Sequence, residues 1–209
     1  MGFPTDLRGG SPSVARPSRR QDEIALLAAL ADRRGEAIVE LGAGDGARSA
    51  SLLRALAPAS YEAFEPSEIL ARVTAREISG AGGGNASVRV HDLARPIPVG
   101  EAAAGVALCL DVIEYLRMDE LYMVLAEARR VLKPGGIAVL RGLSYGGGFG
   151  GSVARTAWTR YPSLASRLFG ARRPLELHHY LSPEDWKVLD ERHDPEGWFT
   201  RQTLALERL

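Results

Sequence analysis

The stretch IVELGAGDG, residues 38–46, joins a short apolar run to three glycines that stand at every second position. A strand that ends in such glycines brings backbone without side chains close to the free N–H groups of a following helix. Residues 47–56 have the composition of that helix. The stretch therefore predicts a strand, a glycine turn and a helix that together can hold a small polar ligand. A tight turn that binds nothing is the alternative interpretation.

Outward from this stretch, apolar segments alternate with segments of helical periodicity. Strands are expected over 37–41, 61–65, 87–91, 105–110 and 137–141, and helices over 47–56, 67–78 and 119–132. Strands separated by helices favour a parallel sheet with helices on both faces. The fold class predicted from the pattern is therefore α/β.

The pattern changes towards both ends of the chain. We expect a mobile tail over 1–20, a helix over 21–34, a glycine-rich loop over 144–151, a helix over 152–169, a turn over 194–197 and a last strand over 198–209. Ser182 has the properties of a helix N-cap, with Pro183 at the first helical position. The predicted organisation is a single domain over 21–209, with a core over 36–143, a lid over 144–181 and a terminal helix and strand over 182–209.

Charge and cysteine content exclude several classes of protein. The 26 basic residues balance the 26 acidic ones, which argues against a surface built to bind nucleic acid. No stretch reaches the roughly 18 apolar residues of a membrane span, and the first twenty residues lack the apolar core of a secretory signal. Cys109 is the single cysteine, so no internal disulfide can form. We expect a cytoplasmic protein, and the arginine-rich composition indicates a GC-rich bacterial gene.

An acidic residue follows the glycine turn at a spacing typical of nucleotide binding. Glu65 lies 23 residues beyond Gly42, where the second strand is predicted to end. An acid at this position of a βαβ unit accepts hydrogen bonds from ribose hydroxyls. Glu62 falls inside the strand and on its other face, because side chains alternate along a strand. Glu65 is therefore the candidate ribose ligand.

Five motifs, namely ELGAGDG, FEPS, HDLARPIP, DVIEYL and EARRVLKPGG, occur in this order within residues 38–143. Together they resemble the class I S-adenosylmethionine-dependent methyltransferases. The resemblance implies a Rossmann-like three-layer sandwich with a mostly parallel seven-stranded sheet, an antiparallel last strand and the cofactor over the strand carboxyl ends. The sequence departs from the family pattern at Ala104 and Gly105, where the family usually has an aromatic–Asp pair. The segment after Trp186 is short for two further strands, so a reduced sixth strand is expected.

The resemblance also implies a set of residues around S-adenosylmethionine, whose product is S-adenosylhomocysteine. Gly42, Ala43, Gly44 and Gly46 are expected along the methionine and ribose parts, with Glu40 near the amino group. Glu65 is expected at the ribose diol, and Asp92 and Leu93 at the adenine. Asp111 is expected nearest the methyl group. For Asp92 and Asp111 the alternative is an ordinary surface or helix-capping acid.

The acceptor is expected to be a small organic molecule, bound under the lid over 144–181. His178 and His179 are candidates for the general base, or else a surface pair, since a histidine titrates near neutral pH. Asp111, Glu114 and Tyr115 are expected to orient the acceptor, and no metal is expected. A dehydrogenase is disfavoured because the glycine motif is G-x-G-x-G and the second mononucleotide half is missing.

The sequence leaves two alternatives to methyl transfer open. One is a protein that binds the cofactor but catalyses a different reaction, and the other is a regulatory or assembly partner with the same fold. The expected oligomeric state is a monomer or a homodimer.

Overall fold

The computed structural model describes residues 30–82, 84–145, 148–169, 174–196 and 199–209. Within these ranges the strands form one seven-stranded sheet with the order β3-β2-β1-β4-β5-β7-β6. The strands are β1 (Ile38–Leu41), β2 (Tyr61–Glu65), β3 (Ala86–Val90), β4 (Ala104–Leu110), β5 (Leu132–Tyr145), β6 (Trp186–Glu196) and β7 (Phe199–Arg208).

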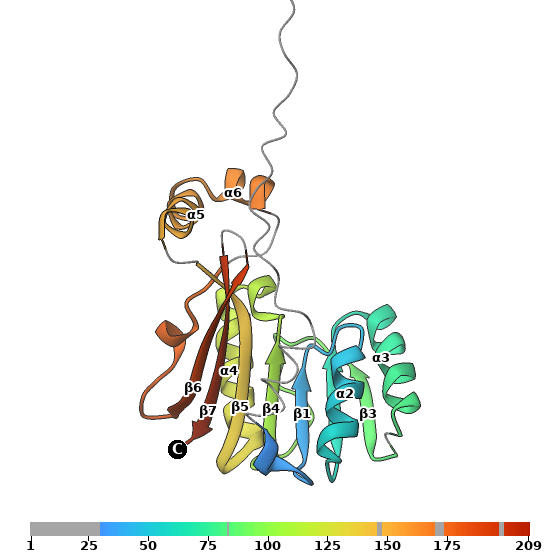
Figure 1. Cartoon of the computed structure of the whole chain (residues 1–209). Coiled ribbons are helices and arrows are strands. Elements are labelled where there is room, and N and C mark those ends of the chain that lie inside the picture. Colours follow the sequence, from blue (N-terminus) through green and yellow to red (C-terminus); the bar gives the residue numbers. More distant parts are fainter. Residues whose placement is uncertain (1–29, 83, 146–147, 170–173, 197–198) are drawn as a thin grey trace, which may run out of the picture.

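Strands β1 to β5 run parallel, β7 is antiparallel to β5, and β6 is antiparallel to β7. The helices are α2 (Ala47–Leu56), α3 (Glu68–Gly80), α4 (Met118–Val131), α5 (Gly148–Arg160) and α6 (Pro162–Phe169). Single 3-10 turns are η1 (Ala31–Arg33), η2 (Ile113–Tyr115) and η3 (Leu177–Tyr180). This arrangement confirms the predicted Rossmann-like sandwich and its antiparallel end (Figure 1).

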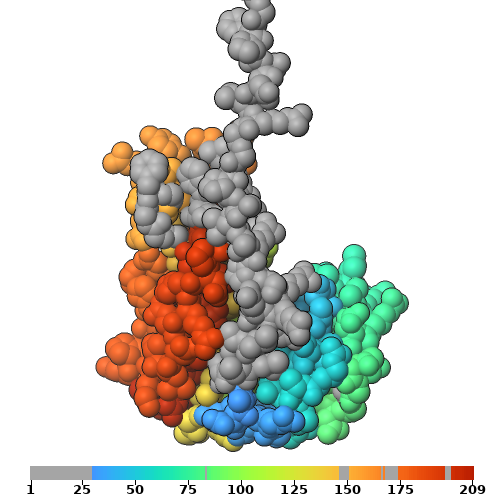
Figure 2. Space-filling view, viewed as in Figure 1, coloured from blue at the N-terminus to red at the C-terminus, as the bar shows by residue number. Residues whose placement is uncertain are grey.

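The core consists of two apolar layers, one on each face of the sheet. Along β4, Val106 and Leu108 pack with α2 and α3, whereas Ala107 and Cys109 pack with α4. Because side chains alternate along a strand, a fully apolar strand supplies both layers, and β4 is buried over its whole length. The C-terminal strands and the α2–α3 side form opposite flanks of the molecule (Figure 2). In the part of the chain that the structure describes, no helix has the length and apolar character needed to span a bilayer.

The segment after Ser182 forms a strand, so the predicted helix there and the predicted reduced sixth strand are both wrong. The turn itself forms, since Asp185 N and Trp186 N donate to the Ser182 carbonyl, each at 3.1 Å. From Trp186 onward, however, the chain pairs with β7 over its full length. Pairing with a long neighbouring strand outweighs the local capping signal, as tertiary context often does.

The lid differs from its prediction at two places. Ser144 and Tyr145 belong to β5, and Gly148 begins α5, so the glycine-rich loop is shorter than expected, with residues 146–147 outside the described ranges. The helix predicted over 152–169 is interrupted at Tyr161, and Pro162 starts α6. Proline lacks an N–H and fixes its own φ, so it is tolerated at the first turn of a helix and not inside one.

Other predictions at the chain ends are corrected in part. The tail over 1–20 and most of the helix over 21–34 lie outside the described residues, and the described end of that helix is only the 3-10 turn η1. In the predicted turn over 194–197, the first three residues belong to β6, and residue 197 lies outside the description.

Candidate active site

The glycine turn after β1 contains three residues in the left-handed region of backbone space, at φ +83° for Gly42, +60° for Gly44 and +76° for Gly46. A Cβ at Gly42 would lie 2.2 Å from Val112 Cγ2, and a Cβ at Gly46 would lie 2.6 Å from Thr74 Cα. A Cβ at Gly44 would meet no atom of the described residues within 4 Å. Packing therefore requires Gly42 and Gly46, whereas Gly44 faces open space.

Glu65 connects this turn to the next helix. Its Oε2 accepts a hydrogen bond from Gly44 N at 2.9 Å, and its Oε1 accepts one from Ser67 N, also at 2.9 Å. Ser67 in turn caps α3 through a bond from Leu70 N. Glu62, by contrast, pairs with Arg89 at 3.1 Å, on the neighbouring strand. The alternation of side chains along β2 thus places Glu65, and not Glu62, at the glycine turn.

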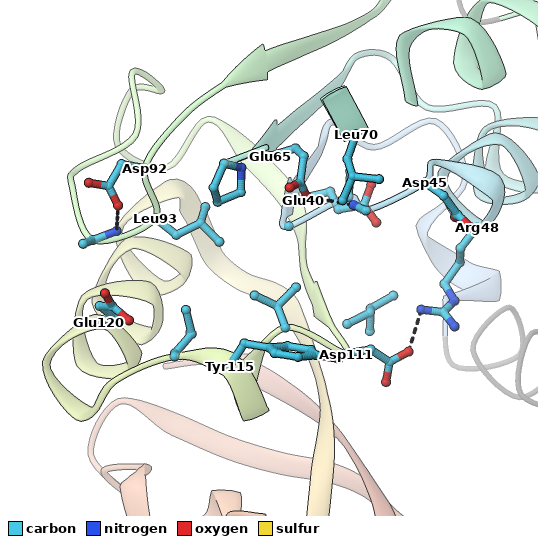
Figure 3. Close-up of a pocket in the computed structure, with 18 of the residues that line it drawn as sticks. Glu40, Asp45, Arg48, Glu65, Leu70, Asp92, Leu93, Asp111, Tyr115 and Glu120 are labelled. Atoms are coloured by element: carbon cyan, nitrogen blue, oxygen red, sulfur yellow. Dashed lines mark hydrogen bonds and ion pairs between the residues drawn. The ribbon is translucent and has the colours of Figure 1, made fainter. Parts of the chain in front are cut away.

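A cavity of about 720 Å³ opens over the carboxyl ends of β1, β2 and β4 (Figure 3). Its volume lies within the range of small-molecule sites. The predicted site residues that line it are Glu40, Gly42, Ala43, Gly44, Glu65, Asp92, Leu93, Asp111 and Tyr115. Gly46 lies behind the lining, against Thr74. The structure therefore brings most of the predicted residues to one place, whereas their roles stay predictions.

Asp92 and Leu93 form the end of the cavity beyond β3. Leu93 is buried, while the side chain of Asp92 is exposed at the rim. Asp92 Oδ1 accepts a hydrogen bond from Ala94 N at 3.0 Å, and Oδ2 lies 3.5 Å from Arg95 Nε. Asp92 thus is a surface acid that accepts a hydrogen bond within a turn, where no helix forms, and it also lines the cavity.

Glu40 lies at the floor of the cavity and is almost completely buried. Its Oε2 accepts hydrogen bonds from Ser49 Oγ at 2.6 Å and Tyr61 Oη at 2.7 Å. Burial raises the pKa of Glu40, and these two bonds offset part of that increase. The carboxyl group therefore ties β1 to α2 and β2 beneath the glycine turn.

Asp111 follows β4 and has a left-handed backbone, with φ +62°. Three arginines in the described part of the chain bind its carboxylate. Arg48 Nη1 lies 3.0 Å from Oδ2, Arg141 donates to both oxygens, and Arg201 Nη1 lies 2.5 Å from Oδ1. Burial alone would raise the pKa of Asp111, but the Arg141 hydrogen bonds and the charges of all three arginines hold the pKa well below its usual range.

Glu114 and Tyr115 lie in η2, directly after Asp111. Glu114 is buried behind the cavity lining, 3.2 Å from Arg201 Nη1, and burial raises its pKa against the effect of Arg201. Its Oε2 has no hydrogen-bond partner among the described residues. Tyr115 is 63% exposed and lies at the cavity. Of the two, only Tyr115 is placed to touch a bound molecule directly.

His178 and His179 lie in η3 and are not among the described residues that line the cavity. Both are exposed, and their ring centroids are 4.1 Å apart. His179 Nδ1 is 3.3 Å from Glu176, which also binds Arg155. The three side chains His178, His179 and Glu176 each offer one potential metal ligand within 4.8 Å of the others. The structure thus supports the surface-pair interpretation of the histidines, and their predicted role as a base gains no support from contact with the cavity.

The three arginines around Asp111 are not among the residues predicted from the sequence. Arg141 lies within β5, directly after four apolar residues, and a charged residue inside a buried strand is a signal that could have indicated it. Arg48, in the first turn of α2, carries no comparable signal, and neither does Arg201 on β7. Only the fold shows that these three residues meet.

A family model described as "Methyltransferase domain" matches residues 38–136. The fold is similar to that of a geranyl diphosphate methyltransferase in complex with geranyl diphosphate and sinefungin, with a TM-score of 0.72, 16% identity and coverage of 91% of this chain and 78% of that one. A search of curated proteins finds no match to the sequence.

Two further solved structures have a similar fold. The [4+2]-cyclase SpnF gives a TM-score of 0.69 at 16% identity, with 90% of this chain and 81% of that one covered. The N-methyltransferase NodS from Bradyrhizobium japonicum WM9 gives a TM-score of 0.67 at 12% identity, with 90% and 95% covered. These likenesses agree with the observed fold and its sheet order.

Proposed function

We propose that the chain, whose residues 38–136 match a methyltransferase-domain model and whose sheet has the methyltransferase order, transfers the methyl group of S-adenosylmethionine to a small organic acceptor. The observation that carries the proposal is the hydrogen bond from Gly44 N to Glu65, which holds the acid at the glycine turn in the lining of a cavity of suitable size. Gly44 leaves open the space that a cofactor next to the turn would need. The residues present therefore fit this cofactor.

Different residues along the cavity would bind different parts of the cofactor. Glu65 would accept hydrogen bonds from the ribose diol, and Asp92 and Leu93 would hold the adenine, through its amine and its ring face respectively. When bound, the cofactor supplies an activated methyl group on a sulfonium. The protein then contributes position and exclusion of water, which are the main terms for an in-line displacement. Asp111 and Tyr115 lie where an acceptor would have to be oriented.

The proposed lid is the segment over 144–181, which includes α5 and α6. Both helices lie beyond the carboxyl end of β5, on the side of the sheet edge where the cavity opens (Figure 1). A cover over this edge would exclude water from the acceptor. The absence of nucleic-acid partners, the cytoplasmic location and the bacterial source stay predictions from composition, and the monomeric or homodimeric state stays an expectation.

A second candidate function is a reaction that uses this fold without methyl transfer. The similar fold of a [4+2]-cyclase keeps this alternative open. Incubation with methyl-labelled S-adenosylmethionine and an acceptor that is consumed would separate the two, because only methyl transfer moves the label into the product.

The cofactor site is tested by calorimetric titration with S-adenosylmethionine, S-adenosylhomocysteine and NAD. We expect micromolar binding of the two sulfur ligands and none of NAD. Glu65→Gln should weaken binding about tenfold or more, since hydrogen bonds to a charged acceptor contribute roughly 1.5–3 kcal/mol.

Glu62→Gln on the same strand is the matched control, because Glu62 pairs with Arg89 away from the glycine turn. Glu65→Gln is preferred to Glu65→Ala, since it keeps an acceptor for Gly44 N. Equal loss of affinity in both glutamine variants would contradict the assignment of Glu65. Absence of binding in the wild-type protein would contradict the proposed function itself.

A further inference from the structure

Arg48 is the member of the arginine cluster that lines the cavity. It stands in the first turn of α2, and its side chain remains 30% exposed. The described structure gives it one side-chain contact, from Nη1 to Asp111 Oδ2 at 3.0 Å (Figure 3). A guanidinium group has five N–H donors in a planar fork, so most of the donors of Arg48 have no partner among the described residues.

Asp111 does not depend on Arg48 for its partners. Arg201 Nη1 and Arg141 Nε donate to Oδ1, and Arg141 Nη2 donates to Oδ2. Both carboxylate oxygens would therefore keep a donor if Arg48 turned away. Buried Arg141 and half-buried Arg201 also favour the ionised form of Asp111, in line with its lowered pKa. Arg48 can accordingly exchange its partner at a small cost.

The backbone around Arg48 favours negative charge as well. The N-cap of α2 is Gly46, which has no side chain, and the carboxylate of Asp45, which also lines the cavity, accepts a hydrogen bond from one first-turn group, Ala47 N, at 3.2 Å. The N-terminus of a ten-residue helix carries partial positive charge from its first-turn N–H groups. A guanidinium and a helix N-terminus thus face the same part of the cavity, and carboxylate or phosphate oxygens match the fork geometry of arginine.

We propose that Arg48, supported by Asp111, is an anion-binding subsite of the cavity and takes a carboxylate or phosphate group. The proposal rests on the proposed function. Figure 3 shows Asp92 at one end of the cavity, Glu65 in the middle and Arg48 with Asp111 at the other end. With adenine at Asp92 and ribose at Glu65, two groups can reach Arg48. One is the α-carboxylate of the cofactor, and the other is an acidic group of the acceptor.

The test compares Arg48→Gln with Arg54→Gln, because Arg54 is an exposed arginine six residues further along the same helix, α2. Calorimetry measures the affinity for S-adenosylhomocysteine and for 5′-methylthioadenosine, which lacks the amino-acid end. It also measures the affinity for inorganic pyrophosphate, added to protein saturated with S-adenosylhomocysteine. If the anion is the cofactor carboxylate, Arg48→Gln lowers the affinity for S-adenosylhomocysteine at least tenfold and changes the affinity for methylthioadenosine by less than twofold. If the anion belongs to the acceptor, only pyrophosphate binding is lost.

Arg48→Lys, which keeps the charge, should restore part of either loss, and Arg54→Gln should change nothing. The proposal is overturned if Arg48→Gln leaves S-adenosylhomocysteine and pyrophosphate binding unchanged. It is also overturned if methylthioadenosine weakens as much as S-adenosylhomocysteine, because Arg48 would then act only on the shape of the site. Thermal unfolding of each variant confirms that it is folded. A wild-type protein that binds pyrophosphate but neither adenosine ligand would contradict the proposed function and not the subsite.

Discussion

At the scale of single residues, the glycines of one motif have different physical roles. Gly42, Gly44 and Gly46 all have a left-handed backbone. A Cβ would clash with Val112 at Gly42 and with Thr74 at Gly46, whereas at Gly44 it would meet no described atom. The same spacing in the sequence therefore contains two residues required by packing and one whose free face opens into the cavity. The difference can be separated experimentally.

Gly46→Ala should reduce the free energy of unfolding by about 2–4 kcal/mol, from left-handed strain plus a clash with the Thr74 backbone. Gly44→Ala should cost only about 1–2 kcal/mol but weaken S-adenosylhomocysteine binding, since its methyl group would enter the cavity. Gly35→Ala is the control, because Gly35 has φ +77° and no described atom near its Cβ position. Denaturant unfolding and calorimetry measure both quantities. Unchanged affinity in Gly44→Ala would show that the ligand does not approach the turn.

At the scale of elements, α4 fixes the loop that follows the adenine end of the cavity. Glu127 Oε2 accepts a hydrogen bond from Ile97 N at 2.8 Å, and Arg130 donates to the carbonyls of Ile97 and Val99 and to Glu127. The Arg130 hydrogen bonds, together with that of Ile97, outweigh burial and lower the pKa of Glu127. Two neighbouring side chains of α4, Glu127 and Arg130, thus hold the backbone of the loop at Ile97 and Val99.

Because the pKa of Glu127 is lowered on folding, the ionised carboxylate stabilises the protein above its usual pKa of 4.5, and this stability is lost as the pH falls below that value. Glu127→Gln should lower the melting temperature at pH 7 by about 2–4 °C, for a loss of about 1 kcal/mol. The difference from wild type should shrink as the pH falls through 4.5. Glu77→Gln, at an exposed site on α3, is the control. A difference that is independent of pH would assign the effect to side-chain packing.

At the scale of the whole molecule, binding in the cavity should stabilise the fold, since the site draws on the loops after β1, β2, β3 and β4. At 100 times its dissociation constant, S-adenosylhomocysteine adds about 2.7 kcal/mol. For a domain of this size, this corresponds to a rise in melting temperature of about 5–11 °C. Thermal unfolding with NAD at the same concentration is the control. Equal shifts with both ligands would argue against a cofactor-specific site.

The sequence by itself determined the glycine turn, the helix after it, the parallel core and the choice of Glu65 over Glu62. These features follow from short-range rules, because left-handed backbone requires glycine and side chains alternate along a strand. They involve residues close in sequence or repeated with a fixed period. The resemblance to a family added the expected positions of Asp92 and Asp111 at the cavity.

Tertiary structure decided what depends on distant partners. The chain after Ser182 forms a strand because β7 is available to pair with it, although its local signal predicts a helix. Arg141 and Arg201 reach Asp111 across 30 and 90 residues of sequence, and Arg48 reaches it across 63. No local period relates these positions. The meeting of their charges follows from the order of strands in the sheet, which brings the carboxyl ends of β4 and β5 together beside the antiparallel β7.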